Sequence, residues 1–289
     1  MRRVTLGVIV AVLGLGAAHA QQQSQSPSGW IADKNGCRIW NPAPKANESV
    51  SWDGPCASGV ANGKGVLQWY LADKPTDRYA GDCVDGRPSG QGVYSWANGN
   101  RYEGEFKDAL PNGHGVAVLA SGSRYDGEWK DGRPNGHGRY VWANGNRYEG
   151  EFKDALPSGH GVATTTDGFR YEGEWKDGRP SGHGVKQWAS GDRYEGELID
   201  NQRNGHGAFA WANGDRYDGE WREGRREGQG VYVWANGNRY EGEWKDDRAQ
   251  GQGTYRTAKG KVFSGSWVNG CFRKGAQSAW VDTEKPACK

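Results

Sequence analysis

A period of 23 residues organises most of the chain. Tyrosines recur at this spacing, and Phe263 continues their series: Tyr79, Tyr102, Tyr125, Tyr148, Tyr171, Tyr194, Tyr217 and Tyr240. Each begins a pattern in which glycines follow at fixed offsets, and Trp52 begins an earlier, degenerate copy. Nine units span 52–262, and a partial tenth follows to residue 272. Such a period predicts a repeat array in which each unit packs only against its neighbours.

A unit of this length has room for two strands and two turns. Ala97-Asn98-Gly99 and its equivalents are tight-turn signals, and a longer turn over 131–136 and its equivalents is expected at the other end of each hairpin. The content of 48 Gly, 15 Trp and 13 Tyr excludes both a disordered chain and collagen. We therefore predict an all-β fold, an elongated single-layer array of β-hairpins in the form of a solenoid-like ribbon.

The length of the Ala97-Asn98-Gly99 loop decides which face of the sheet carries the rings. A three-residue loop pairs Tyr94 with Tyr102 and gathers all rings on one face, whereas a two-residue turn splits them between faces. We favour the three-residue loop because it collects the apolar surface. Glu103, Glu105 and their equivalents then form a charged ladder on the opposite face.

The repeat resembles the MORN repeat family. The motif Tyr-Glu-Gly-Glu-Trp-Lys-Asp-Gly-x-x-x-Gly-x-Gly, from Tyr171 to Gly184, carries the resemblance, which covers 52–272. It implies an array of β-hairpins used as a scaffold for protein contacts and, in some members, associated with membrane lipids. The family has no catalytic residues to carry over, and the chain has no room for an added kinase or methyltransferase domain. The chain is most similar to an exported bacterial protein that consists of repeats only.

Residues 1–20 are predicted to be a secretory signal peptide. Arg2 and Arg3 precede a short apolar run, and Ala18-His19-Ala20 is typical of a cleavage site after Ala20. The run is too short to cross a bilayer, so no transmembrane segment is expected in the mature chain. We expect an exported protein, periplasmic or secreted. A disordered linker (21–29), an N-terminal cap (30–51) and a C-terminal cap or tail (273–289) are expected around the array.

The charge of the chain disfavours two classes of partner. The whole chain carries a formal charge of +2, and residues 1–20 contain two arginines and no acid, so the mature chain is formally neutral. Nucleic-acid binding requires a basic patch, and polybasic membrane binding requires clustered Lys and Arg. Neither pattern is present, and we expect no nucleic-acid partner.

Five cysteines in an exported chain predict disulfides. We predict Cys37–Cys56 and Cys271–Cys288, each of which would staple one end of the array. Cys56 and Cys83 occupy the same position in successive repeats, so their Cα atoms should lie about 10 Å apart, beyond the roughly 7 Å that a disulfide allows. Cys83 is therefore predicted to be a buried free thiol, and Cys37–Cys83 is the main competing pairing.

Recurring polar residues do not predict an active site. The histidines His114, His137, His160, His183 and His206 are 23 residues apart, so one row cannot bring two ligands to a single metal ion. Paired carboxylates such as Glu149 and Glu151 recur on the charged face, without the two distinct environments that a glycosidase needs. We predict a non-enzymatic protein without a metal or another cofactor.

A second aromatic row gives the best functional signal. A single sheet with no covering helix cannot bury a full aromatic face, so part of it must be covered by curling, a second copy or a partner. The candidate partner-binding residues are Tyr94, Trp96, Tyr140, Trp142, Trp188, Phe209, Trp211, Tyr232 and Trp234. The alternative is that they form the core. Our hypothesis is an exported scaffold that binds an envelope protein or a second copy of itself; a module for cell-wall glycan or a membrane surface is the alternative.

Overall fold

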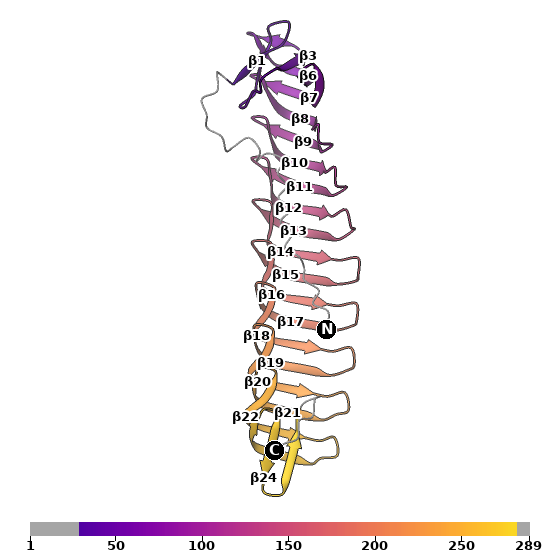
Figure 1. Cartoon of the computed structure of the whole chain (residues 1–289), viewed down its shortest axis with the longest axis vertical. Helices are drawn as coiled ribbons and strands as arrows, with labels where there is room; N and C mark the ends of the chain where they lie inside the picture. Colours follow the sequence, from indigo (N-terminus) through magenta and orange to yellow (C-terminus); the bar gives the residue numbers. More distant parts are fainter. Residues whose placement is uncertain (1–28, 282–289) are drawn as a thin grey trace. The chain divides into compact units, whose positions relative to one another are not determined.

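A computed structural model describes residues 29–281 of the chain (Figure 1). The chain divides into two compact units, Met1–Pro157 and Ser158–Lys289. Every regular element between residues 29 and 281 is a β-strand, and this part of the chain holds no helix that could cross a membrane. The predicted all-β fold is confirmed. The predicted signal peptide and most of the predicted linker lie outside the described residues.

The first unit contains an antiparallel sheet of successive hairpins. Each strand pairs with the next along the chain, from β3 to β13: β3 pairs with β6, and from β6 onward each strand pairs with the next one in sequence. The strands are β3 (Glu48–Trp52), β6 (Gly63–Leu71), β7 (Lys74–Val84), β8 (Arg87–Ser95), β9 (Arg101–Lys107), β10 (Leu110–Val118), β11 (Arg124–Lys130), β12 (Arg133–Val141) and β13 (Arg147–Lys153).

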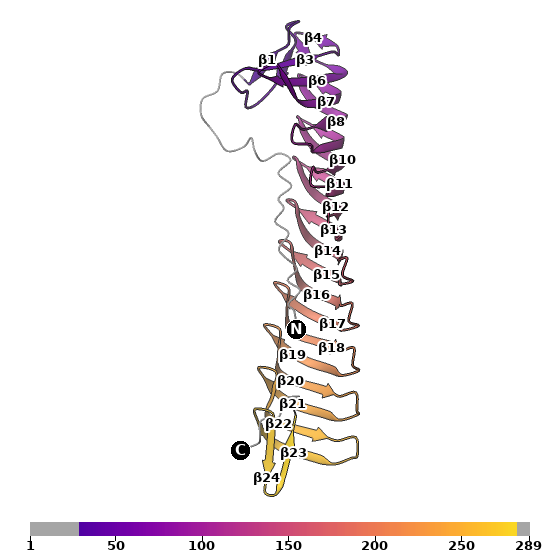
Figure 2. The ribbon, with the colours of Figure 1, turned by 45° about the vertical axis from the view of Figure 1, so that its right-hand side comes forward.

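A small second sheet lies beside β6 and β7 in this unit (Figures 1 and 2). It consists of β1 (Trp30–Ala32), β2 (Arg38–Trp40), β5 (Val60–Ala61) and β4 (Cys56–Ala57), in that order. The predicted Cys37–Cys56 disulfide is present, with its Cα atoms 5.9 Å apart. The segment 30–51 therefore contributes both to this sheet and, through β3, to the repeat sheet.

The second unit is one open antiparallel sheet. Its strands are β14 (Leu156–Thr164, which begins at the boundary between the units), β15 (Arg170–Lys176), β16 (Arg179–Gln187), β17 (Arg193–Ile199), β18 (Gln202–Ala210), β19 (Arg216–Arg222), β20 (Arg225–Val233), β21 (Arg239–Lys245), β22 (Arg248–Arg256), β23 (Val262–Val268), β24 (Cys271–Lys274) and β25 (Gln277–Trp280). Within the described part of this unit β25 pairs with β24 alone, so the sheet does not close on itself. Cys288 lies outside the described residues, so the Cys271–Cys288 bond stays a prediction.

The tight turn confirms the three-residue loop. Trp96 N donates to Asn100 O (2.9 Å) and Gly99 N to Trp96 O (2.9 Å), with Gly99 in the left-handed region at φ +88°. Tyr94 consequently pairs with Tyr102. The rings of the hairpin therefore share one face, as predicted.

The other turn differs from the prediction. The segment 131–136 is not one long turn: only Asp131 and Gly132 form it, at φ +48° and +79°, and Lys130 pairs with Arg133. This two-residue turn matches the twist of its strands. The extra residues enter β12 through a bulge, at which Gly136 has φ +96°.

The repeat-start tyrosines are buried and form the core of the array. Tyr125 is 0% exposed, and its ring meets those of Trp129 and Phe152 edge to face, each with centroids 5.1 Å away. Glycines allow this packing: a Cβ on Gly184 would lie 2.5 Å from Cε2 of Tyr171. The ring thus lies against bare backbone, and its edges are covered by one ring of its own strand and one ring of the next repeat.

Candidate partner-binding face

The second aromatic row lies at the margin of this core. Three of its predicted members are buried and belong to the core: Tyr140 (4% exposed), Phe209 (6%) and Tyr232 (7%). The other six are half-buried: Tyr94, Trp96, Trp142, Trp188, Trp211 and Trp234. The row is therefore part core and part accessible surface.

In the second unit these rings form an uninterrupted ladder across successive hairpins. The centroid separations are 5.6 Å for Trp188–Phe209, 4.5 Å for Phe209–Trp211, 5.2 Å for Trp211–Tyr232 and 4.5 Å for Tyr232–Trp234. The buried rings hold the half-buried tryptophans between them. We call these five residues the ring ladder. Rigid aromatic anchors of this kind are typical of protein-binding hot spots.

The corresponding row of the first unit is shorter. Tyr94 contacts Trp69 (5.7 Å) and Trp96 (4.4 Å), and Tyr140 contacts Trp142 (4.6 Å). Leu119 takes the position of the tryptophan between these two groups, so the rings do not connect. The longer accessible aromatic surface is therefore the ring ladder.

Lys186 lies on the face of the second unit that carries the repeat-start tyrosines, which we call the inner face. Most repeats have a tyrosine or another apolar residue at this position. Lys186 is 6% exposed and pairs with Tyr171 on one side and Tyr194 on the other. Its Nζ donates to the backbone oxygen (2.6 Å) and to Oδ1 (2.7 Å) of Asn201. Burial, and secondarily the positive charge of Arg203, lower the pKa of Lys186 to about 7.

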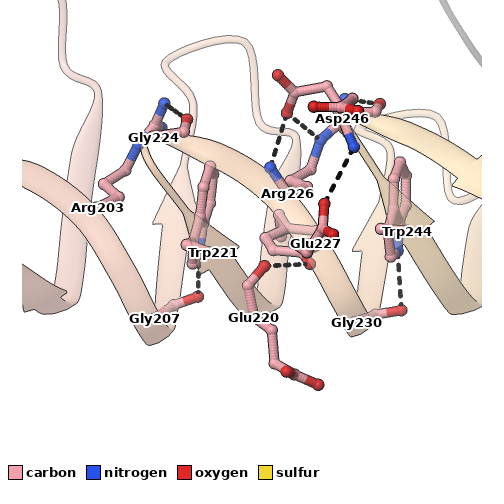
Figure 3. A network of polar contacts seen from close by, with 12 residues as sticks. Arg203, Gly207, Glu220, Trp221, Gly224, Arg226, Glu227, Gly230, Trp244 and Asp246 are labelled. Carbon is pink, nitrogen blue, oxygen red and sulfur yellow. Dashed lines mark hydrogen bonds and ion pairs between the residues drawn. The ribbon is translucent and has the colours of Figure 1, made fainter.

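Two arginines follow on the same face. Arg203 places its guanidinium carbon 4.1 Å from the ring centroid of Trp221, and Arg226 lies 4.3 Å from that of Trp244 (Figure 3). Arg203 Nη2 donates to the backbone oxygen of Gly224 (2.6 Å). Burial is the main cause that lowers the pKa of Arg203, although the guanidinium remains charged.

Our sequence prediction did not include these three cations. Their signal is a break in the period. At the position of the two arginines, the five preceding units carry Pro88, Pro111, Pro134, Pro157 and Pro180, and the next two units carry Arg203 and Arg226 instead. An analysis of what the repeats share could not find them, because each departs from the shared pattern.

The opposite face carries the predicted charged ladder. Arg124 pairs with Asp126 (2.8 Å), and His114 Nε2 lies 3.4 Å from the same carboxylate. The five histidines of the row are exposed. Among residues 29–281, no group of three His, Cys, Asp or Glu side chains could hold a metal ion. Cys83 is a buried free cysteine.

The family model for the MORN repeat matches nine segments, which together make up more than half of the chain: 57–70, 79–101, 102–124, 125–147, 148–170, 171–193, 194–216, 217–239 and 240–262. The chain belongs to the MORN-repeat family. MORN repeats are in general non-catalytic, and the ring ladder of this MORN-repeat protein is compatible with a binding or scaffold role.

Two solved structures are distantly similar to this MORN-repeat protein. The G-box domain of the microcephaly protein CPAP is 11% identical with a TM-score of 0.34, over 71% of this chain and 94% of that one. The TCP domain of SAS-4 from Drosophila melanogaster is 10% identical with a TM-score of 0.23, over 62% and 84%. Likeness at this level carries no argument about function. No curated protein matches the sequence.

Proposed function

We propose that this MORN-repeat protein is a non-enzymatic binding or scaffold protein, and that its ring ladder binds another protein. The half-buried tryptophans Trp188, Trp211 and Trp234 carry the proposal, because each is held by a buried ring and leaves part of its own surface accessible. Rigid aromatic side chains bind at a low cost in conformational entropy. A second copy of the chain is one partner that this surface accepts.

The distribution of polar groups supports a binding role over catalysis. The carboxylates and histidines recur once per repeat on an exposed face, where Arg101 and Glu103 or Arg193 and Glu195 neutralise each other along one strand. A catalytic site would need such groups to converge in different environments. Among residues 29–281, the one carboxylate bonded to the cations of the inner face is Asp247, which forms an ion pair with Arg226.

The proposal includes export to a periplasm or to the medium. The N-terminal pattern of Arg2, Arg3 and the Ala18-His19-Ala20 segment supports it, and so does the Cys37–Cys56 disulfide, because such bonds persist in oxidising compartments. N-terminal sequencing of the protein isolated from its own cells should begin at Gln21. A chain that retains its first residues in the cytoplasmic fraction would contradict export.

Crosslinking of the protein in its own envelope fraction, followed by mass spectrometry, tests the binding function. Trp188→Ala combined with Trp211→Ala should abolish capture of a dominant partner. The matched control combines Ile199→Ala with Val268→Ala, which removes two exposed apolar side chains (59% and 60% exposed) outside the ladder. Equal capture by wild type and the tryptophan variant would contradict the proposal.

The half-buried tryptophans also favour a second candidate, a module for cell-wall glycan or a membrane surface, because such rings stack on sugars and settle at interfaces. The formal neutrality of the mature chain weakens the membrane version. If crosslinking captures no protein, sedimentation with sacculi and with lipid vesicles decides between the two surfaces. If the protein binds to sacculi or to vesicles, and if this binding requires Trp188 and Trp211, then that surface and not a protein is the ligand of the ring ladder.

A further inference from the structure

The inner face of the second unit carries more positive than negative charge. Lys186, Arg203 and Arg226 all lie there. Of the carboxylates among residues 29–281, Asp247 bonds to Arg226 at 3.1 Å from its Nε, and the buried Asp215 accepts a hydrogen bond from Tyr232 of the ring ladder. Within residues 29–281, no carboxylate forms an ion pair with Lys186 or Arg203. Burying charges without a counter-charge is costly, so an arrangement of this kind favours an incoming anion.

The two unpaired cations have hydrogen-bonding capacity to spare. Nζ of Lys186 donates to two neutral oxygens of Asn201 and has a third N–H. Arg203 donates one of its five N–H groups, to the backbone oxygen of Gly224. The guanidinium of Arg203 is held over Trp221 and also lies 5.1 Å from the ring centroid of Phe209. A preorganised guanidinium with free donors is suited to a bidentate carboxylate.

The same region departs from the repeat pattern at one further position. Leu198 takes the place of a tryptophan or phenylalanine that most of the other units carry there (two carry Cys56 and Cys83), and it pairs with Arg203 across the hairpin. Leu198 lies on β17, next to the strand β16 that carries Lys186. Three substitutions at neighbouring positions thus replace rings and a proline by cations and a smaller residue, beside the ring ladder.

We infer that Lys186 and Arg203 form a docking site for an acidic side chain of a partner protein. The ring ladder then contacts the apolar residues that flank this acidic residue in the partner. This inference rests on the proposed function and specifies its partner as an acidic, partly apolar segment. Lys186 is 6% exposed, so the site suits a single protruding acidic side chain rather than an anion spread over a flat membrane. Three cations lie with two carboxylates on this face, and the remaining positive charge supplies the charge complementarity.

A purely structural role makes a different prediction. Lys186 and Arg203 each bond to the turn of the following hairpin, at Asn201 and Gly224, so both contribute to the fold. If that were their whole role, substitutions would lower stability without changing any preference between acidic and neutral ligands. Anion selectivity therefore separates the two roles.

The test uses two fluorescein-labelled octapeptides, one alternating Glu with Leu and one alternating Gln with Leu, titrated with the full mature chain in an anisotropy assay. The Glu peptide should bind at least about tenfold more tightly, since hydrogen bonds to charged groups are the stronger ones. Lys186→Tyr with Arg203→Pro should reduce this preference to less than about twofold. Both changes install the residue that is commonest at that position among the repeats, so the fold has a precedent for each.

Three further variants keep the test decisive. Arg216→Gln with Arg222→Gln removes the same two charges from exposed positions on β19 and should retain the preference. Lys186→Met and Arg203→Gln, made singly, provide folded alternatives if the double variant unfolds, and each should lose part of the preference. Circular dichroism of every variant confirms that it is folded.

Several results would overturn the inference. One is equal affinity for the two peptides, or no binding of the Glu peptide at millimolar concentration; another is a preference that survives Lys186→Tyr with Arg203→Pro or is lost equally in the β19 control. Displacement of the peptide by inorganic phosphate far more readily than by acetate would assign the site to phosphate. If the crosslinked partner is lost with the tryptophan variant but retained with Lys186→Tyr and Arg203→Pro, the proposed function stands and the acidic docking site does not.

Discussion

Lys186 should make the stability of the second unit depend on pH in a way that can be measured. Burial and the charge of Arg203 lower its pKa from 10.5 to about 7 in the folded protein. In the unfolded chain the lysine regains its ordinary value of about 10.4. Between these values the unfolded chain binds a proton that the folded chain has released. The free energy of unfolding therefore rises with pH above about 7, and Lys186 adds no dependence well below it, where both states hold the proton.

The size of the effect follows from that difference of one proton. The limiting slope is about 1.36 kcal/mol per pH unit, with half of it at pH 7, so the gain between pH 7.0 and 8.5 is about 1.7 kcal/mol. The window ends there because burial, followed by the charge of Asp82, raises the pKa of Cys83 to about 12. At higher pH the unfolded thiol ionises first, and this opposes the contribution of Lys186.

Urea unfolding, followed by tryptophan fluorescence at pH 7.0 and 8.5, measures this gain. Lys186→Met removes the titrating group and keeps an unbranched side chain, so its unfolding free energy should lack about 1.7 kcal/mol of the rise seen in wild type. Lys176→Met, at an exposed position of β15, should behave as wild type. If the unfolding free energies of wild type and Lys186→Met rise in parallel with pH, the folded lysine keeps its proton over this range and the reasoning fails.

Three further changes test the fold. Gly184→Ala would bring a Cβ to 2.5 Å from the ring of Tyr171 and should lower the free energy of unfolding by about 1–3 kcal/mol in urea titrations. Replacing Cys37 and Cys56 by serine opens a loop with a sequence separation of 19 and should cost the first unit about 3 kcal/mol, measured the same way. Asp215→Ala removes a carboxylate that accepts bonds from a tyrosine hydroxyl and a backbone amide, both at 2.8 Å, and should lower the melting temperature through a loss of about 2 kcal/mol.

The fold could be predicted because the period and the loop chemistry are local signals. The Ala97-Asn98-Gly99 loop predicted the pairing of Tyr94 with Tyr102, since the left-handed conformation of Gly99 fixes the loop length. The second turn was harder to predict, because the segment 131–136 contains two turn signals and only the Asp131-Gly132 pair forms the turn. The other glycine, Gly136, serves a bulge instead.

The depth of the core could not be derived from the strand pattern alone. A flat single sheet would leave its rings open, but a ring such as Tyr125 (0% exposed) lies over glycines and meets rings of two hairpins. Whether a ring becomes core or surface thus depends on its neighbours in space. Tyr232 (7% exposed) and Trp234 are only two residues apart, yet Tyr232 belongs to the core and Trp234 is half-buried at the surface.

The regularity of the array limits what its shared residues can explain. A tyrosine or glycine that appears in every unit is accounted for by contacts between neighbouring units, because every unit must make those contacts. A residue that breaks the period has no such explanation and carries its own cost, which for Lys186 is a buried amine without a carboxylate. Lys186, Leu198 and Arg203 break the period in adjacent strands and beside the longest run of accessible rings. The same positions are also broken elsewhere, as at Cys83 and Arg226. Among the described residues, however, only Lys186 and Arg203 place two buried or half-buried cations without an ion pair in one part of the inner face, and this combination is the argument for a shared ligand.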